Sequence, residues 1–332
     1  MGAPAAVILG LAGTELSKEE QAFFSEANPW GFILFARNID NPAQLRALTR
    51  DLRDAVGRDA PILIDQEGGR VQRMRSPDWR EYLPALDQMA RAADPIRAQW
   101  LRNRLIAAEL CDVGIDVNCA PLVDLVEDET HPVLHNRLYG GDVTTVVRAA
   151  RTCAEAFLSG GVLPVLKHIP GYGRARVDGH LHLPRVSASR AELAVRDFAP
   201  FQALNDIRMG MTAHIVMEAI DPENAATVSA PVMQVIREEI GFEGLMMTDD
   251  ISMEALSGSV ADRSAAAIAA GCDIVLHCNG KRDEMAQVVA ASGNLSLAGQ
   301  RRADDALAQR QNPTPVDSDR LAADLEALLA AG

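Results

Sequence analysis

The sequence predicts an α/β protein, a single-domain (β/α)8 TIM barrel with extra helices after it. Short apolar runs alternate with longer amphipathic stretches as far as about residue 293, which is typical of a parallel sheet covered by helices. About eight such runs occur, and eight parallel strands close a barrel of this kind. No linker rich in proline, glycine or serine interrupts the alternation, so the 332 residues are expected to form one domain.

The strands are expected at the apolar runs and the helices at the amphipathic stretches between them. The expected strands are 6–10, 31–35, 61–65, 116–120, 163–167, 209–212, 245–248 and 273–276. The expected helices are 18–27, 42–56, 95–113, 144–159, 190–205, 231–240 and 261–270. Pro42, Pro95 and Pro231 support three of the helix starts, because proline suits the first helical turn.

The tail of the chain differs from the rest. The segment Asn312-Pro-Thr-Pro separates two stretches rich in alanine and leucine, and no strand-like run occurs there. We therefore expect a catalytic barrel over residues 1–302 and a helical extension over residues 303–332 that packs on the outside of the barrel.

Charge and cysteine content limit the partners and the compartment. The net charge of −14 opposes binding to nucleic acid, which needs clustered positive charge, and favours a small neutral or anionic substrate. The five cysteines contain no C-x-x-C pair and are odd in number, so reduced thiols in a cytoplasmic protein are expected. The apolar stretch 5–11 is too short to span a bilayer, and no basic residue precedes Lys18. We expect a cytoplasmic monomer that does not bind a membrane.

Polar residues follow nearly every expected strand, at the end of the barrel where active sites lie. They are Arg37 and Asn38, the segment Asp65-Gln66-Glu67-Gly68-Gly69-Arg70, Asp124, Lys167 and His168, His214, Asp249 and Asp250, and His277. A single polar residue in such a place is usually a cap, a turn former or a satisfied buried donor. So many ionisable groups are costly to desolvate together, and their convergence predicts an active site.

The pair Asp249-Asp250 suggests a nucleophile. Asp249 follows the run 245–248 and can point over the barrel mouth, whereas Asp250 points away from it or starts the next helix. Asp250 is therefore expected to be structural, and Asp249 is the candidate nucleophile.

The stretch K-H-I-P-G-Y-G-R-A-R-V-D-G-H, residues 167–180, supplies the other groups. Lys167 and His168 are cationic donors at a strand end, and a glycine-rich loop leads from them to Asp178 and His180. Asp178 can orient the imidazole of His180, which can give and then take a proton near neutral pH. A retaining hydrolysis needs a group with this behaviour. The alternative is an ordinary loop hydrogen bond between the two side chains.

A metal site is a competing interpretation of the same loop. Asp178, His180 and His182 could bind a metal ion, because His-x-His presents two imidazoles from one extended segment. The remaining ligands would have to come from single residues elsewhere, since no cluster of cysteine and histidine has metal spacing. We therefore expect neither a metal nor another cofactor.

With these residues, the chain resembles the single-domain bacterial β-N-acetylglucosaminidases of glycoside hydrolase family 3, from about Gly31 to about Asn279. The segments that carry the resemblance are G-F-I-L-F-A-R-N (31–38), D-Q-E-G-G-R-V-Q-R (65–73), N-R-L-Y (136–139), K-H-I-P-G-Y-G (167–173), D-G-H (178–180), M-T-A-H (211–214), T-D-D-I-S-M (248–253) and A-G-C-D (270–273).

The resemblance implies a retaining exo-β-N-acetylglucosaminidase that releases N-acetylglucosamine from peptidoglycan-derived muropeptides through a covalent glycosyl-enzyme. It implies that Asp249 is the nucleophile and that His180, supported by Asp178, is the acid/base. It also implies a set of residues that hold the terminal sugar, namely Asp65, Arg73, Arg137, Lys167 and His168. Two positions depart from the family pattern in a loop expected to move during catalysis: Tyr172 stands where histidine is usual, and Gly179 where serine is usual.

Three other functions remain open. The first is a phosphorylase, in which phosphate resolves the glycosyl-enzyme, because a histidine acid/base repels phosphate less than a carboxylate does. The second is a β-glucosidase of the same family. The third is a sugar-binding barrel without activity, since fold alone does not give function. The presence of Asp249, Asp178 and His180 argues against the third, because binding needs neither a nucleophile nor an acid/base.

Overall fold

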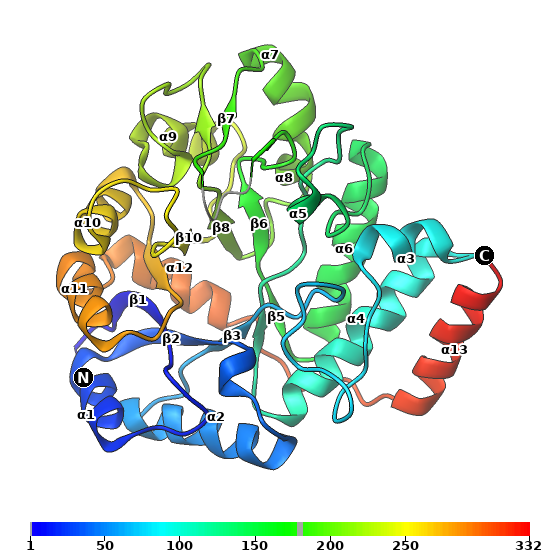
Figure 1. The fold of residues 1–332 in the computed structure, drawn as a ribbon, viewed down its shortest axis with the longest axis horizontal. Helices are drawn as coiled ribbons and strands as arrows, with labels where there is room; N and C mark the ends of the chain where they lie inside the picture. Colours follow the sequence, from blue (N-terminus) through cyan, green and yellow to red (C-terminus); the bar gives the residue numbers. More distant parts are fainter. Residues whose placement is uncertain (1, 178–181) are drawn as a thin grey trace.

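The computed structural model describes residues 2–177 and 182–332. Its main sheet has nine strand segments in the order β5-β4-β3-β2-β1-β11-β10-β8-β6, all paired in parallel, with helices around them (Figure 1). The segments at the two ends of this order, β5 (Leu163–Pro164) and β6 (Leu166–Ile169), are parts of one run interrupted at Val165. The sheet therefore starts and ends on the same run and closes as an eight-stranded barrel, which confirms the predicted fold class.

The remaining barrel strands coincide with the other seven predicted runs. They are β1 (Ala5–Gly10), β2 (Pro29–Leu34), β3 (Ile62–Ile64), β4 (Val117–Asn118), β8 (Met209–Thr212), β10 (Leu245–Asp250) and β11 (Ile274–His277). A separate parallel pair joins β7 (Arg185–Val186) to β9 (Val216–Met217) beside the barrel.

Six of the predicted helices form with starts that local chemistry explains. They are α1 (Lys18–Ala27), α2 (Pro42–Val56), α4 (Pro95–Asp112), α6 (Val143–Ser159), α9 (Ala230–Glu238) and α10 (Val260–Ala270). In α2 and α4, Asn41 and Asp94 accept a hydrogen bond from a backbone N–H of the first turn, and a proline follows each cap. No helix in the described part of the chain is long and apolar enough to cross a membrane.

The predicted helix 190–205 is broken into three pieces. They are α7 (Arg190–Glu192), the π-helical turn η2 (Leu193–Asp197) and α8 (Ala199–Ala203). Pro200 explains the break, because it has no backbone N–H for the carbonyl one turn earlier and its ring crowds that carbonyl. The other helices outside the predictions are α3 (Ala85–Arg91), α5 (Pro132–His135) and α11 (Arg282–Ser292).

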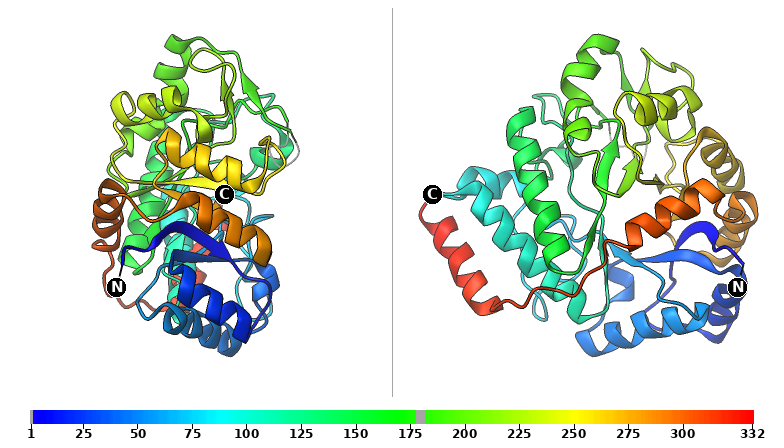
Figure 2. Two further views of the ribbon diagram at one scale, coloured as in Figure 1. Left: turned by 90° about the vertical axis from the view of Figure 1, so that its left-hand side faces the viewer. Right: turned by 180° about the vertical axis from the view of Figure 1, so that it is seen from behind.

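The helix α12 (Leu297–Leu307) closes the end of the barrel where the strands begin. Its Ala303 and Ala306 belong to the same buried cluster as inward-facing residues such as Ile8 and Ile274. Seen from behind, α12 (orange) lies at the front of the molecule, in the half that holds the N-terminus (Figure 2). The expected boundary between residues 302 and 303 therefore falls inside α12. The sequence suggested that the segment from residue 303 packs on the outside of the barrel, whereas α12 packs against the inward-facing residues. The last helix, α13 (Ser318–Ala330), packs against α4 at the outer surface.

Candidate active site

A pocket of about 200 Å³ opens at the end of the barrel where the strands finish. It brings together six of the eight residues that the sequence selects, namely Asp65, Arg73, Arg137, Lys167, His168 and Asp249. The other two, Asp178 and His180, lie outside the described residues. The convergence expected for an active site is therefore present for the candidate sugar-holding residues and the candidate nucleophile.

Asp65 and Lys167 form the centre of a buried network of charges. Asp65 follows β3, and Lys167 lies in β6, where only 2% of its side chain is exposed. The Nζ of Lys167 donates to Oδ1 of Asp65 at 2.9 Å, and Nη2 of Arg73 donates to Oδ2 at 3.2 Å. Burial alone raises the pKa of Asp65, but Lys167 and Arg73 hold it well below its ordinary value.

Glu67 is a further member of the buried charge network, and the selection of site residues missed it. Its side chain is 5% exposed and receives two parallel hydrogen bonds from Arg137, Nε to Oε2 at 2.9 Å and Nη2 to Oε1 at 2.8 Å. The Nζ of Lys167 also lies 2.8 Å from Oε1. The signal in the sequence was its spacing of two from Asp65, because alternate residues of an extended segment face the same side.

The network fixes the protonation of Glu67. Burial alone raises the pKa of this carboxyl group, but Arg137 and Lys167 lower it from 4.5 to about 2. The negative charge of Glu67 is therefore present throughout the physiological range, and it holds Arg137 and Lys167 in place.

Glu67→Gln is expected to reduce the amount by which the unfolding free energy falls as the pH is lowered. Because the pKa of Glu67 is about 2 in the folded protein against an ordinary 4.5, its stabilising effect is complete above about pH 4.5 and is lost as the pH falls toward 2. Urea unfolding across this range should show a smaller change in unfolding free energy for the variant than for the parent.

Glu81→Gln is the matched control, because Glu81 pairs with Arg75 at 2.8 Å on the surface, with 48% of its side chain exposed. It should lose stability in acid as steeply as the parent does. Parallel pH curves for the parent and Glu67→Gln would contradict the assignment.

Asp249 lies at the end of β10 with the properties of an ionised nucleophile. Burial alone raises the pKa of its carboxyl group, whereas the nearby His214 and the backbone N–H of Asp250 lower it below its ordinary value. The backbone N–H of Asp250 donates to Oδ1 of Asp249 at 2.8 Å. A carboxylate that is ionised and held from one side is suited to attack an electrophilic carbon.

Asp250 has structural contacts, as its position in the sequence suggested. Its carboxylate accepts hydrogen bonds from the hydroxyl of Ser252 at 2.8 and 2.9 Å and from the backbone N–H of Cys278 at 3.1 Å, which ties β10 to the end of β11. The Nε2 of His214 lies 3.0 Å from the backbone oxygen of Asp250. Because a carbonyl only accepts, Nε2 carries a proton and His214 holds the residue next to Asp249.

Three other polar residues at strand ends make structural contacts outside the pocket. Arg37 donates to the carbonyls of Leu11 and Cys278, and Asn38 donates to that of Leu11 at 3.3 Å. His277 lies 3.2 Å from Glu284, on the face of β11 that points toward the helices. None of the three lines the pocket.

The start of the glycine-rich loop is fixed by close backbone packing. A Cβ atom on Gly173 would lie 2.0 Å from the backbone oxygen of Leu125, so only glycine fits. The hydroxyl of Thr130 donates to the carbonyl of Gly173 at 2.7 Å. Tyr172, one of the departures from the family pattern, places its ring 5.6 Å from that of His168. Gly179, the other departure, lies outside the described residues.

Gly173→Ala is expected to lower kcat on the order of 10²-fold, because its new methyl group would displace the segment that leads to the proposed acid/base. Steady-state kinetics checks this result. Gly140→Ala is the control, since a Cβ there meets only the Thr145 side chain at an ordinary 3.4 Å. Equal kcat values in the two variants would show that the segment tolerates the shift.

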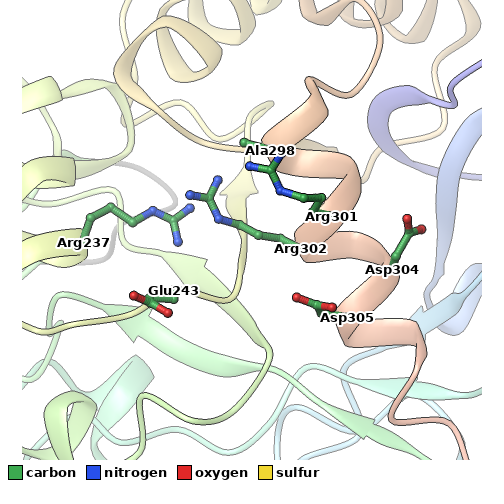
Figure 3. Close-up of a pocket in the computed structure, with 7 residues that line it drawn as sticks. All are labelled: Arg237, Glu243, Ala298, Arg301, Arg302, Asp304 and Asp305. Atoms are coloured by element: carbon green, nitrogen blue, oxygen red, sulfur yellow. The ribbon is translucent and has the colours of Figure 1, made fainter.

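A second hollow lies at the other end of the barrel, between α9 and α12 (Figure 3). Arg237 and Arg302 reach into it, and both bind the buried carboxylate of Asp273, at 2.9 and 2.8 Å. Three further carboxylates line it beside Arg301, those of Glu243, Asp304 and Asp305. Acidic groups therefore neutralise the arginines, and the two ion pairs to Asp273 connect α9 to α12.

The barrel and its strand-end pocket are those expected of a carbohydrate-active enzyme, because the charged donors and acceptors that line the pocket suit sugar hydroxyls. A family model described as the glycosyl hydrolase family 3 N terminal domain matches residues 6–310, beyond both ends of the motif resemblance. The chain belongs to glycosyl hydrolase family 3 and is a glycoside hydrolase.

Relatives with named functions are similar over most of this chain. A β-hexosaminidase of Alkalilimnicola ehrlichii is 39% identical over 82% of this chain and 80% of its own length. A β-hexosaminidase of Pseudomonas aeruginosa is 34% identical over 89% of this chain and 86% of its own. The solved structure of NagZ from Neisseria gonorrhoeae in complex with N-trifluoroacetyl-D-glucosamine is 28% identical, with a TM-score of 0.85 over 99% of this chain and 97% of that one.

Proposed function

We propose that the protein is a retaining exo-β-N-acetylglucosaminidase that releases terminal N-acetylglucosamine from muropeptides. The observation that carries the proposal is the position of the ionised Asp249 in the same pocket as the buried network around Asp65 and Lys167. The β-hexosaminidases among the relatives, and the amino-sugar complex of the Neisseria gonorrhoeae protein, support the choice of sugar.

In the proposed reaction, Asp249 attacks the anomeric carbon while His180 protonates the leaving oxygen. The glycosidic C–O bond breaks as the ester bond to Asp249 forms. His180, oriented by Asp178, then removes a proton from water, which attacks the same carbon and restores the free Asp249. Two inversions give retention of the β-configuration. The roles of His180 and Asp178 rest on the sequence.

The sugar-holding residues have a separate task. We propose that Asp65, Arg73, Arg137, Lys167 and His168 bind the hydroxyls of the terminal sugar. Asp65 contacts Lys167 and Arg73, and Arg137 contacts Glu67, so these side chains are held in place before the substrate arrives, which lowers the entropic cost of binding.

The test is a comparison of kcat/KM for aryl β-glycosides of N-acetylglucosamine, glucose and xylose, because that ratio measures differential transition-state binding. The proposal expects a clear preference for N-acetylglucosamine and a first product of β-configuration. A preference for glucose would identify a β-glucosidase, and dependence on added phosphate would identify a phosphorylase. A fluorinated slow substrate should leave a glycosyl adduct on Asp249, visible by mass spectrometry.

We also propose that the protein works in the cytoplasm as a monomer. All five cysteines are free thiols, which fits a reducing compartment. Sedimentation of the purified protein checks the oligomeric state.

A further inference from the structure

Asp124 is a buried carboxylate that contacts the pocket residue His168 from behind. It lies on the segment after β4, and none of its side chain is exposed. Its Oδ2 lies 2.8 Å from Nδ1 of His168 and accepts from the backbone N–H of His168 at 3.3 Å. Its Oδ1 accepts from the backbone N–H of Tyr172 at 2.6 Å. Both carboxylate oxygens are thus fixed by backbone donors and cannot turn away from the imidazole.

These contacts determine which ring nitrogen of His168 carries the proton. An ionised carboxylate accepts hydrogen bonds and cannot donate them, so Nδ1 of His168 must be the donor. Nε2 is then the ring nitrogen left for a ligand, and His168 lines the pocket. An aspartate fixes the tautomer of a histidine in the same way in hydrolytic triads.

The pocket has many donors, and the carboxylates beside them already accept hydrogen bonds. Lys167, Arg73 and Arg137 supply several N–H groups, and their partners Asp65 and Glu67 accept from them with both oxygens. A sugar hydroxyl that accepts from these cations must also donate its own proton. An imidazole that donates from Nδ1 to Asp124 presents the lone pair of Nε2 to receive it.

We propose that Asp124 is a positioning residue that fixes the Nδ1–H tautomer of His168, so that Nε2 accepts a hydrogen bond from one hydroxyl of the bound sugar. The identity of the ligand rests on the proposed function, whereas the tautomer does not. The consequence is selectivity: the site distinguishes a hydroxyl, which donates, from a group at the same position that only accepts.

The tautomer is measured first, on the parent protein and without substrate. Nitrogen-15 NMR of the histidine rings, with the His168 signals assigned by their loss in His168→Gln, should show a proton on Nδ1 and a bare Nε2. A proton on Nε2, alone or together with one on Nδ1, overturns the proposal whatever the enzyme hydrolyses.

Asp124→Asn should reverse the tautomer. The amide group of the new side chain can donate to Nδ1, which moves the ring proton to Nε2 and turns that atom into a donor. The nitrogen spectrum of the variant should show this change. A spectrum unchanged from that of the parent would mean that Asp124 does not set the tautomer.

The kinetic test uses aryl N-acetylglucosaminides in which each hydroxyl in turn is replaced by hydrogen or by fluorine. In the parent, both replacements at the hydroxyl bound by His168 should lower kcat/KM by about 10- to 100-fold, because neither can donate. In Asp124→Asn, kcat/KM for the fluoro compound should rise relative to kcat/KM for the deoxy compound. The reason is that fluorine can accept a hydrogen bond from Nε2–H, whereas hydrogen cannot. The ratio of the two rates is compared between parent and variant, so intrinsic reactivity cancels.

Asp273→Asn separates positioning from simple loss of stability. Asp273 is a carboxylate with a 5% exposed side chain that accepts from Arg237, Arg302 and the backbone N–H of Met246, at the opposite end of the barrel. Its variant should unfold at a lower temperature and keep the parent's fluoro-to-deoxy ratio. If Asp273→Asn changes that ratio as Asp124→Asn does, or if Asp124→Asn leaves it unchanged, the positioning role is wrong.

Discussion

Asp249→Asn is expected to lower kcat on an aryl β-N-acetylglucosaminide on the order of 10⁴-fold, with the fold intact. Asparagine has the same shape and keeps an oxygen for the backbone N–H of Asp250, so the end of β10 should not move. What is lost is the negative charge that must form the bond to the anomeric carbon. Steady-state rates together with thermal unfolding of the variant measure both parts of this expectation.

Two further variants sharpen the result. Asp249→Gly with added azide should recover part of the rate and give a glycosyl azide of inverted configuration, because the small anion takes the place of the missing carboxylate. Asp250→Asn removes the same charge one residue later, where the carboxylate binds Ser252 and Cys278. The Asp250→Asn variant should be less stable than the parent and should still form the covalent intermediate. Full activity in Asp249→Asn would refute the nucleophile assignment.

Lys167→Met is expected to reduce both stability and kcat/KM strongly. Lys167 contacts Asp65 at 2.9 Å and Glu67 at 2.8 Å from a position that is 2% exposed. Its removal leaves two buried carboxylates with one fewer cation beside them. Loss of one partner from a buried ion pair lowers the unfolding free energy by about 3–5 kcal/mol. The pKa values of both carboxyl groups, which Lys167 lowers, should rise.

Chemical denaturation and kcat/KM measure these effects. The matched control is Lys281→Met, because Lys281 also pairs with a carboxylate, that of Glu284 at 3.0 Å, but is 68% exposed. An exposed pair contributes about 1 kcal/mol or less, so the control should unfold almost as the parent does. Similar losses of unfolding free energy in the two variants would mean that the buried network contributes no more to stability than a surface ion pair.

The barrel could be predicted from the sequence because its signals are local. Each strand is a short apolar run, and starts such as Asn41-Pro42 carry their own cap and first turn. The exceptions have identifiable causes. Pro200 broke an otherwise helical pattern, and α12 looked like an outer helix because alanine, which lines its inner face, is equally suited to a surface helix.

The charged site was predicted less completely, because its partners are distant in sequence. Glu67 and Arg137 are 70 residues apart, and no local pattern links them. The direction of a side chain at a strand end also depends on the strand register, which composition does not reveal. This is why position after a strand alone did not separate His277 and Arg37 from Lys167, which the family resemblance selected.

The closure of the barrel by α12 has a consequence for the order of events in the proposed reaction. Ala303 and Ala306 belong to the buried cluster at the end where the strands begin, and Asp249 lines the pocket that opens at the other end. The aglycone must therefore leave through the passage by which water enters. While it stays in that passage, its hydroxyl competes with water for the glycosyl-enzyme. Simple alcohols added to the assay should accordingly appear as β-glycosides among the products.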